Sequence, residues 1–144
     1  MFPFSVRQRV RFGETDALGV VYYANYLLYA EVGRMGYLRA LGVDRDRDLL
    51  AHGVDLLIGE ASVRYRAPLH FDEEYDVKVR LGGIRGSSFV LEYHVDSADG
   101  TQCAVISTIQ VIIDVTTRRA AAIPPALRAT LEAAKHAPAT TQGG

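Results

Sequence analysis

The stretch from Ala24 to Leu41 constrains the fold most, because it predicts a long helix that is apolar almost all the way round. Its aliphatic side chains lie on or near one face, at positions Leu27, Leu28, Val32, Met35, Leu38 and Leu41. Other members widen this face, namely Tyr26, Tyr29, Ala30 and Tyr37. A helix of this kind is usually buried on most of its sides. The rest of the chain must therefore supply a surface that covers it.

Glycines inside and after this helix indicate what the covering surface is. Gly33 and Gly36 each cost about 1 kcal/mol of helix propensity relative to alanine. We therefore expect them where the helix backbone approaches a sheet closely. Gly42 is expected to end the helix, because glycine readily adopts the left-handed conformation of a helix C-terminus.

Most of the remaining chain has the patterns of β-strands. Five segments alternate or are rich in β-branched residues, at 6–12, 54–66 with an interruption at Gly59, 75–81, 88–95 and 101–115. Ala98-Asp99-Gly100 predicts a hairpin turn, Asp44 to His52 a short helical or irregular connector, and Pro124 to Lys135 a final amphipathic helix. This order predicts an α+β domain over residues 1–135, an antiparallel five-stranded sheet around one long central helix. Residues 136–144 are expected to be a disordered tail.

Composition narrows the class of protein. The chain has 144 residues, which suits a single domain, and its one cysteine rules out an internal disulfide framework. No apolar run approaches the roughly 20 residues of a membrane span, and the N-terminus lacks the pattern of a signal peptide. We therefore expect a cytoplasmic protein. A net charge of −1 without a dense basic run argues against a nucleic-acid partner.

The segment that leads into the long helix carries a chemical signal. Residues 14–19 predict a turn that holds Asp16 immediately before the helix. A carboxylate can attack a carbonyl or activate water against one. A helix N-terminus presents free N–H groups and a positive dipole end to a developing oxyanion. The pairing indicates acyl-group chemistry, and both roles of Asp16 remain open.

The same segment resembles the active-site signature of a known family, the hotdog-fold acyl-CoA thioesterases. The branch that it resembles contains 4-hydroxybenzoyl-CoA thioesterase. The resemblance extends from Ser5 to Leu131 and rests on one fairly specific motif, Asp16-x-x-Gly19-Val20-Val21-x-Tyr23-x-Asn25-Tyr26. Weaker matches follow at Tyr65-x-x-Pro68, Arg85-x-x-Ser88-Phe89 and Ile123-Pro124.

The resemblance implies an activity and a set of residue roles. The enzyme would hydrolyse an acyl-CoA thioester to a free acid and coenzyme A, which is part of the substrate, so that no cofactor is expected. Asp16 would act as nucleophile or general base, and the Tyr23 backbone N–H would polarise the thioester carbonyl. Expected substrate contacts are Gly19, Val20, Tyr22, Asn25 and Tyr26, with Arg85, Arg118 and Arg119 toward the phosphates of coenzyme A. Glu14 competes with Asp16 by proximity and is interpreted as structural.

The sequence leaves other functions and the state of assembly open. A thioesterase that acts on acyl carrier protein and a non-catalytic acyl-CoA-binding protein are alternatives, and the acyl group is not determined. Cys103 lies in a strand pattern and is interpreted as a buried inert thiol, and no residue spacing predicts a metal site. An exposed edge strand and a partly exposed helix would favour a homodimer or a tetramer built from two dimers. In relatives the active sites lie at the dimer interface.

Overall fold

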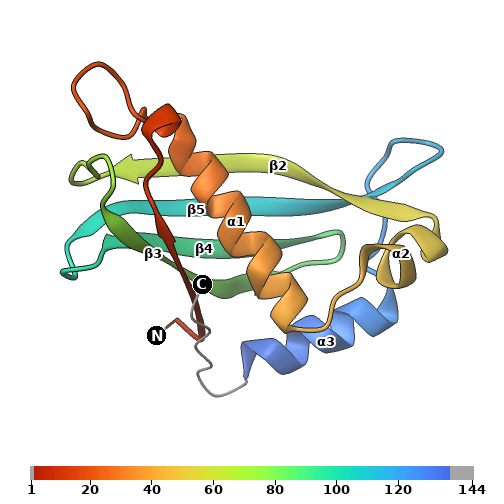
Figure 1. The fold of residues 1–144 in the computed structure, drawn as a ribbon. Coiled ribbons are helices and arrows are strands. Elements are labelled where there is room, and N and C mark those ends of the chain that lie inside the picture. The colour runs from red at the N-terminus through yellow and green to blue at the C-terminus, as the bar shows by residue number, and fades with distance from the viewer. Residues whose placement is uncertain (1, 137–144) are drawn as a thin grey trace.

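The frame of the protein is one antiparallel sheet, seen in a computed structural model that describes residues 2–136. Its strands lie in the order β1-β3-β4-β5-β2 (Figure 1). Their bounds are β1 (Phe4–Arg9), β2 (Val54–Tyr65), β3 (Glu74–Ile84), β4 (Ser88–Ser97) and β5 (Gln102–Asp114). The predicted antiparallel five-stranded sheet is confirmed. The first strand ends earlier than expected, because a 3-10 turn, η1 (Phe12–Glu14), follows it.

Within the described part of the chain, three α-helices accompany the sheet. They are α1 (Asn25–Ala40), the short α2 (Arg45–Asp48), which leads into a 3-10 turn η2 (Leu50–His52), and α3 (Pro125–Lys135). The longest, α1, crosses one face of the sheet (Figure 1). It ends at Ala40, and Gly42 follows with a φ of +81°, the left-handed conformation that the sequence predicted at the helix C-terminus. The predicted final helix is present as α3 and packs against β3 as well, so the sheet does not surround α1 alone.

The side of α1 that faces the sheet consists mainly of the residues that were expected to widen its apolar face. The buried residues are Tyr26, Tyr29, Ala30, Gly33 and Tyr37. The aliphatic stripe faces away and keeps much of its surface exposed, with 43% at Leu27, 53% at Leu28, 38% at Val32 and 51% at Met35. The expected burial on most sides is therefore met on the tyrosine side, and of the aliphatic residues Leu38 and Leu41 pack against the core.

Close packing explains this orientation. A Cβ atom at Gly33 would lie 2.6 Å from Val77 Cγ1 and 2.9 Å from Val79 Cγ2, so the helix backbone touches the strand β3. Only a face with small residues at its centre allows this approach. The tyrosines on either side fill the wider gaps. The prediction that the helix glycines mark close approach to a sheet is confirmed.

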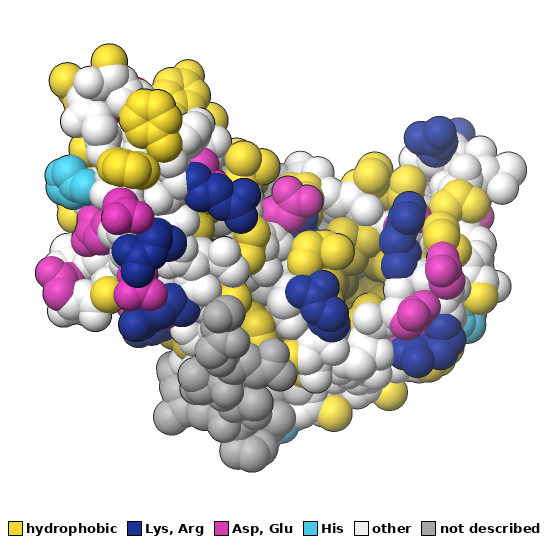
Figure 2. Space-filling view, in the orientation of Figure 1, with side chains coloured by type: hydrophobic (Ala, Val, Ile, Leu, Met, Phe, Trp, Pro, Cys, Tyr) yellow, Lys and Arg dark blue, Asp and Glu magenta, His cyan; other side chains and the backbone are white. Residues whose placement is uncertain are grey.

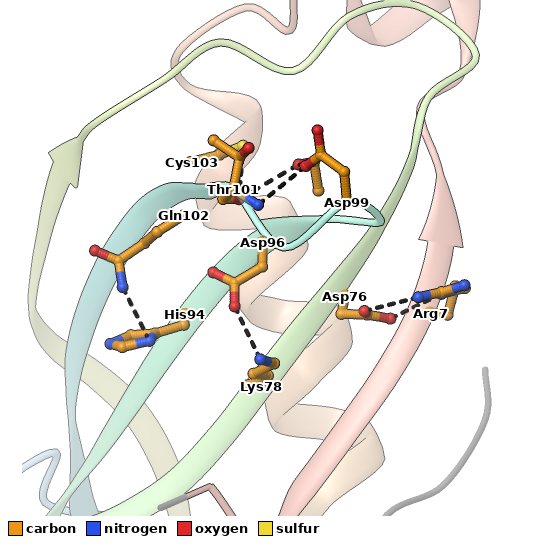
Figure 3. Close-up of polar contacts among 10 residues, drawn as sticks. Arg7, Asp76, Lys78, His94, Asp96, Asp99, Thr101, Gln102 and Cys103 are labelled. Atoms are coloured by element: carbon orange, nitrogen blue, oxygen red, sulfur yellow. Dashed lines mark hydrogen bonds and ion pairs between the residues drawn. The ribbon is translucent and has the colours of Figure 1, made fainter.

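The two faces of the sheet differ in polarity. Along β3 the buried residues alternate with polar residues that lie on the opposite face, Asp76, Lys78 and Arg80. Those residues form ion pairs with neighbouring strands, at 2.9 Å for Arg7–Asp76, 2.9 Å for Lys78–Asp96 and 2.8 Å for Arg80–Glu92. Figure 3 shows the first two pairs beside the Gln102–His94 contact. The core therefore lies between the sheet and the helices, on one side only.

Two further expectations concern the edges and ends of the chain. The predicted interruption at Gly59 is confirmed as a shift of register between Ile58 and Glu60 in the pairing of β2 with β5. Of the expected disordered tail, residues 137–144 lie outside the described residues. No helix within residues 2–136 has the length and apolarity needed to cross a bilayer.

The contact at Gly33 generates a test of this packing. We expect Gly33→Ala to lower the free energy of unfolding by about 1–2 kcal/mol, because the new methyl group overpacks Val77 and Val79. Gly36→Ala is the matched control in the same helix. Its Cβ would meet the ring tip of Phe4 at 3.0 Å, and the gain in helix propensity offsets the adjustment. Urea unfolding of both variants measures the difference, and equal stabilities would contradict the packing.

Candidate functional site

A tight hairpin over residues 14–22 carries Asp16 to the start of α1. The Tyr22 N–H donates to the Glu14 carbonyl and the Asp16 N–H to the Val20 carbonyl, both at 2.9 Å. Gly19 closes the turn with a φ of +79°, a conformation that favours glycine. The carboxylate of Asp16 is exposed, and its Oδ1 accepts the Leu18 N–H at 2.8 Å. The turn itself therefore orients this carboxylate.

A distant segment supports the hairpin from its other side. The Val21 N–H donates to the Leu69 carbonyl and the Phe71 N–H to the Gly19 carbonyl, both at 2.9 Å. Val20 consequently lies between Asp16 on one strand and His70 on the other. Sequence reasoning did not connect His70 with the hairpin, because this pairing joins segments about 50 residues apart and leaves no local pattern.

Glu14 connects the hairpin to α1. Its Oε1 accepts the Arg11 N–H and the Tyr29 hydroxyl, both at 2.9 Å, and its carbonyl accepts the Asn25 side-chain amide at 2.9 Å. Burial of Tyr29 together with its bond to Glu14 raises the pKa of that phenol. These contacts are those of a structural residue. Asn25, which was expected at the substrate or as a helix-positioning group, uses its amide to position the first turn of the helix.

The start of α1 presents backbone donors without acceptors. Within residues 2–136, neither the Tyr23 N–H nor the Ala24 N–H donates a hydrogen bond, whereas the Asn25 N–H donates to the Tyr22 carbonyl at 2.9 Å. The Tyr65 hydroxyl holds the Tyr23 carbonyl at 2.9 Å. Free N–H groups at the positive end of a helix dipole form a site that favours a developing negative charge.

An aromatic pocket of about 360 Å³ adjoins this helix start. Its lining residues are Val21, Tyr23, Tyr26, Tyr65, Arg66, Ala67 and Pro68. Tyr26 is buried in it, and burial raises the pKa of the Tyr26 phenol to about 12, so this side chain is neutral at physiological pH. Tyr22 is exposed, and its ring lies against the Tyr23 ring at a tilt of 46°, with 4.8 Å between the centroids. Of the residues predicted for the substrate, Tyr23 and Tyr26 line this pocket, and Asp16, Gly19 and Val20 belong to the hairpin beside the helix start.

The three predicted arginines lie elsewhere in the chain. Arg85 is in the β3–β4 hairpin, and Arg118 and Arg119 follow β5. They share the end of the sheet where Val54 pairs with Asp114, whereas Tyr65 pairs with Ala104 near the helix start. The ten residue steps between these positions on β5 correspond to about 33 Å of strand. A single chain therefore separates the arginines from Tyr23 by the length of the sheet (Figure 1).

Metal and thiol chemistry find no support among the described residues. Residues 2–136 contain no group of three or more His, Cys, Asp or Glu side chains placed to hold a metal ion. Cys103 is buried, and burial raises the pKa of its thiol. A raised pKa disfavours the thiolate, which is the nucleophilic form.

Comparison with protein families identifies the fold and its class of enzyme. Residues 10–131 match the family model of the thioesterase-like superfamily. The chain belongs to this superfamily. The predicted thioester hydrolase class is thereby confirmed, while the 4-hydroxybenzoyl-CoA branch stays a prediction.

Similar proteins carry thioesterase names. A 1,4-dihydroxy-2-naphthoyl-CoA hydrolase of Thermosynechococcus vestitus is 30% identical over 128 residues, covering 89% of this chain and 88% of that one. The acyl-CoA thioester hydrolase YbgC of Escherichia coli is 28% identical over 119 residues, covering 83% and 88%. The crystal structure of Slr0204, a 1,4-dihydroxy-2-naphthoyl-CoA thioesterase from Synechocystis, superposes with a TM-score of 0.83 at 21% identity, covering 93% of this chain and 98% of that one. The last comparison establishes the fold alone.

Proposed function

We propose that this protein is an acyl-CoA thioesterase that hydrolyses a thioester to a free acid and coenzyme A. The observation that carries the proposal is the pair of free N–H groups at Tyr23 and Ala24, at the positive end of α1 and beside an aromatic pocket. Acyl-CoA names among the relatives support coenzyme A as the carrier of the acyl group.

The first step uses the helix start. The thioester carbonyl oxygen accepts the Tyr23 N–H, and the dipole of α1 stabilises the negative charge that develops on this oxygen. These N–H donors are already in position before the reaction begins, so the protein does not have to reorganise as the charge develops. The Tyr65 hydroxyl is a positioning group, because it holds the Tyr23 carbonyl and so fixes the peptide that follows.

The second step uses Asp16. In one route its carboxylate attacks the carbonyl carbon, the C–S bond breaks, and coenzyme A leaves as a thiolate that takes a proton from solvent. Water then hydrolyses the mixed anhydride to the free acid and restores the carboxylate. In the other route Asp16 removes a proton from water as the water attacks, and this proton is passed to the leaving thiolate. Both routes end in the same products.

The assembly that we propose is a homodimer, or a tetramer built from two dimers. Strand β2 is an edge of the sheet, and exposed side chains cover its middle, including Leu57 and Ile58. An unpaired edge of this length is prone to pair with another chain. The exposed aliphatic stripe of α1 is a second surface that association would cover.

Pairing of two β2 strands would also complete the site. The end of β2 at Tyr65 adjoins Tyr23, and its other end at Val54 adjoins the loop with Arg118 and Arg119. An antiparallel pair would lay each Tyr65 end beside the partner's arginine end. We therefore propose that arginines of the opposite chain hold the phosphates of coenzyme A, because guanidinium groups pair well with phosphate.

Asp16→Asn tests the reacting group. We expect a folded protein whose kcat is at least about 100-fold lower, as for the loss of an acid–base group, with substrate binding retained. The matched control is Glu14→Gln, two residues earlier. It removes the charge of the carboxylate that accepts the Arg11 N–H and the Tyr29 hydroxyl, so it should lower the free energy of unfolding and reduce kcat much less than Asp16→Asn does. Release of free thiol from acyl-CoA measures turnover. Near-normal kcat in Asp16→Asn would refute the assignment.

The assembly is tested by light scattering at micromolar concentration. We expect a mass of at least twice the 15.8 kDa of the chain. Ile58→Lys should yield monomers that lose activity, because a charge in the middle of the edge opposes pairing. Ala129→Lys, at an exposed position of α3, is the control and should stay associated. A stable monomer with full activity would contradict both the dimer and the shared site.

The arginines are tested through the substrate. Neutralising Arg85, or Arg118 together with Arg119, should raise KM for acyl-CoA and leave kcat nearly unchanged, because distant phosphate contacts provide uniform binding. The effect should shrink at high salt, since exposed ion pairs are screened. A truncated thioester without the nucleotide is the control and should show no change. Equal rises in KM for both substrates would assign these arginines to the fold or the assembly.

A further inference from the structure

A second and larger pocket lies away from the hairpin. It occupies about 640 Å³ between the C-terminal half of α1, the α2 connector and the first residues of β2. In Figure 2 this region appears as a hollow with hydrophobic surface inside it and basic side chains at its border. Its volume is typical of sites for small molecules. The apolar part of the lining consists of Met35, Leu38, Val43, Leu49 and Leu56.

The carboxylates in this pocket are already engaged. Asp55 forms a two-bond ion pair with Arg45, at 2.6 Å from Nη2 to Oδ2 and 3.2 Å from Nε to Oδ1. This pair lowers the pKa of Asp55. Asp44 caps α2, since its Oδ1 accepts the Arg47 N–H at 2.8 Å. Neither carboxylate is therefore paired with the two remaining cations of the lining.

Those cations are Arg34 and Arg39, both on α1. Within residues 2–136 neither guanidinium forms an ion pair. Arg34 is half-buried and lies near the buried Tyr93 hydroxyl. Burial raises the pKa of the Tyr93 phenol, and the positive charge of Arg34 opposes this rise. Tyr93 is in turn bonded to Thr108 at 2.7 Å. The pocket thus combines an apolar lining with two positive charges that lack a carboxylate partner.

We propose that this pocket binds an apolar carboxylic acid, with its carboxylate at Arg34 and Arg39 and its hydrocarbon body against the apolar lining. The inference rests on the proposed function, because hydrolysis of an acyl thioester releases such an acid. A carboxylate suits guanidinium groups in both charge and geometry. None of the lining residues is aromatic, so the pocket lacks a surface on which a nucleotide base would stack.

The position of the pocket sets it apart from the reacting centre. Arg34 follows Tyr23 by eleven residues, which corresponds to about 16 Å along a helix. An acid held at Arg34 therefore leaves the helix start of the same chain free for the next thioester.

Calorimetric titration with decanoate and with decanol tests the site. We expect decanoate to bind saturably, one per chain, and at least about 10-fold more tightly than decanol, because only decanoate pairs with the guanidinium groups. Arg34→Met and Arg39→Met should each weaken decanoate about 10-fold and leave decanol unchanged. Arg39 is exposed, so its variant remains informative if Arg34→Met does not fold. Lys135→Met, which removes an exposed cation of α3, is the control.

Several outcomes would overturn the proposal. Equal binding of decanoate and decanol, or equal losses in Lys135→Met and Arg39→Met, would show that the pocket does not recognise a carboxylate. Displacement of decanoate by adenosine 3′,5′-bisphosphate, with the same dependence on Arg39, would assign the pocket to a nucleotide. A change of oligomeric state in Arg39→Met without loss of decanoate binding would assign it to a second copy of the chain.

The same titration on Asp16→Asn separates this inference from the proposed function. Saturable decanoate binding by wild type and variant, together with no hydrolysis of any acyl-CoA by wild type, would support the acid site and refute the thioesterase. Hydrolysis by wild type without decanoate binding by either protein would support the thioesterase and refute the acid site.

Discussion

The contact between Gly33 and the two valines of β3 determines how the rest of the protein is arranged. Because a Cβ at Gly33 would lie within 3 Å of both side chains, α1 has one orientation on the sheet. That orientation turns Tyr29 inward, where its hydroxyl reaches the carboxylate of Glu14. Glu14 in turn holds the hairpin and the first turn of the helix. The placement of the Asp16 hairpin against the first turn of α1 thus depends on a packing contact more than two helical turns away.

The length of the sheet imposes a second constraint. The strands carry the helix start at one end and the arginines at the other, and an extended backbone cannot shorten this separation. In the function that we propose, the reactive thioester and the phosphates of the substrate need both features. The proposed antiparallel association along β2 would bring opposite ends together by symmetry, without any change in the fold of either chain.

The sequence predicts the elements well and their mutual arrangement less well. Alternation and turn residues locate the strands to within a few positions, and Gly42 and Gly59 mark a helix end and an irregularity as expected. The tyrosine side of α1 is buried as expected, but the exposure of its other aliphatic residues was not foreseen, because both kinds of residue recur at helical spacing and periodicity cannot rank them. The pairing of Val20 with His70 and the pocket at Arg34 were also missed, since each joins segments far apart in the chain.

The start of α1 lacks a side-chain cap. Ala24 occupies the cap position and offers no side-chain oxygen to the first N–H groups. Helices with Ser, Thr, Asp or Asn at this position gain roughly 0.5–2 kcal/mol, so α1 forgoes that stabilisation. Instead, the Asn25 side-chain amide donates to the Glu14 carbonyl, and this hydrogen bond positions the first turn of the helix against the hairpin. In the mechanism that we propose, a capping oxygen would place an acceptor where the thioester oxygen binds. The uncapped end, secured by Asn25 and Glu14, leaves the Tyr23 N–H without an acceptor among the described residues.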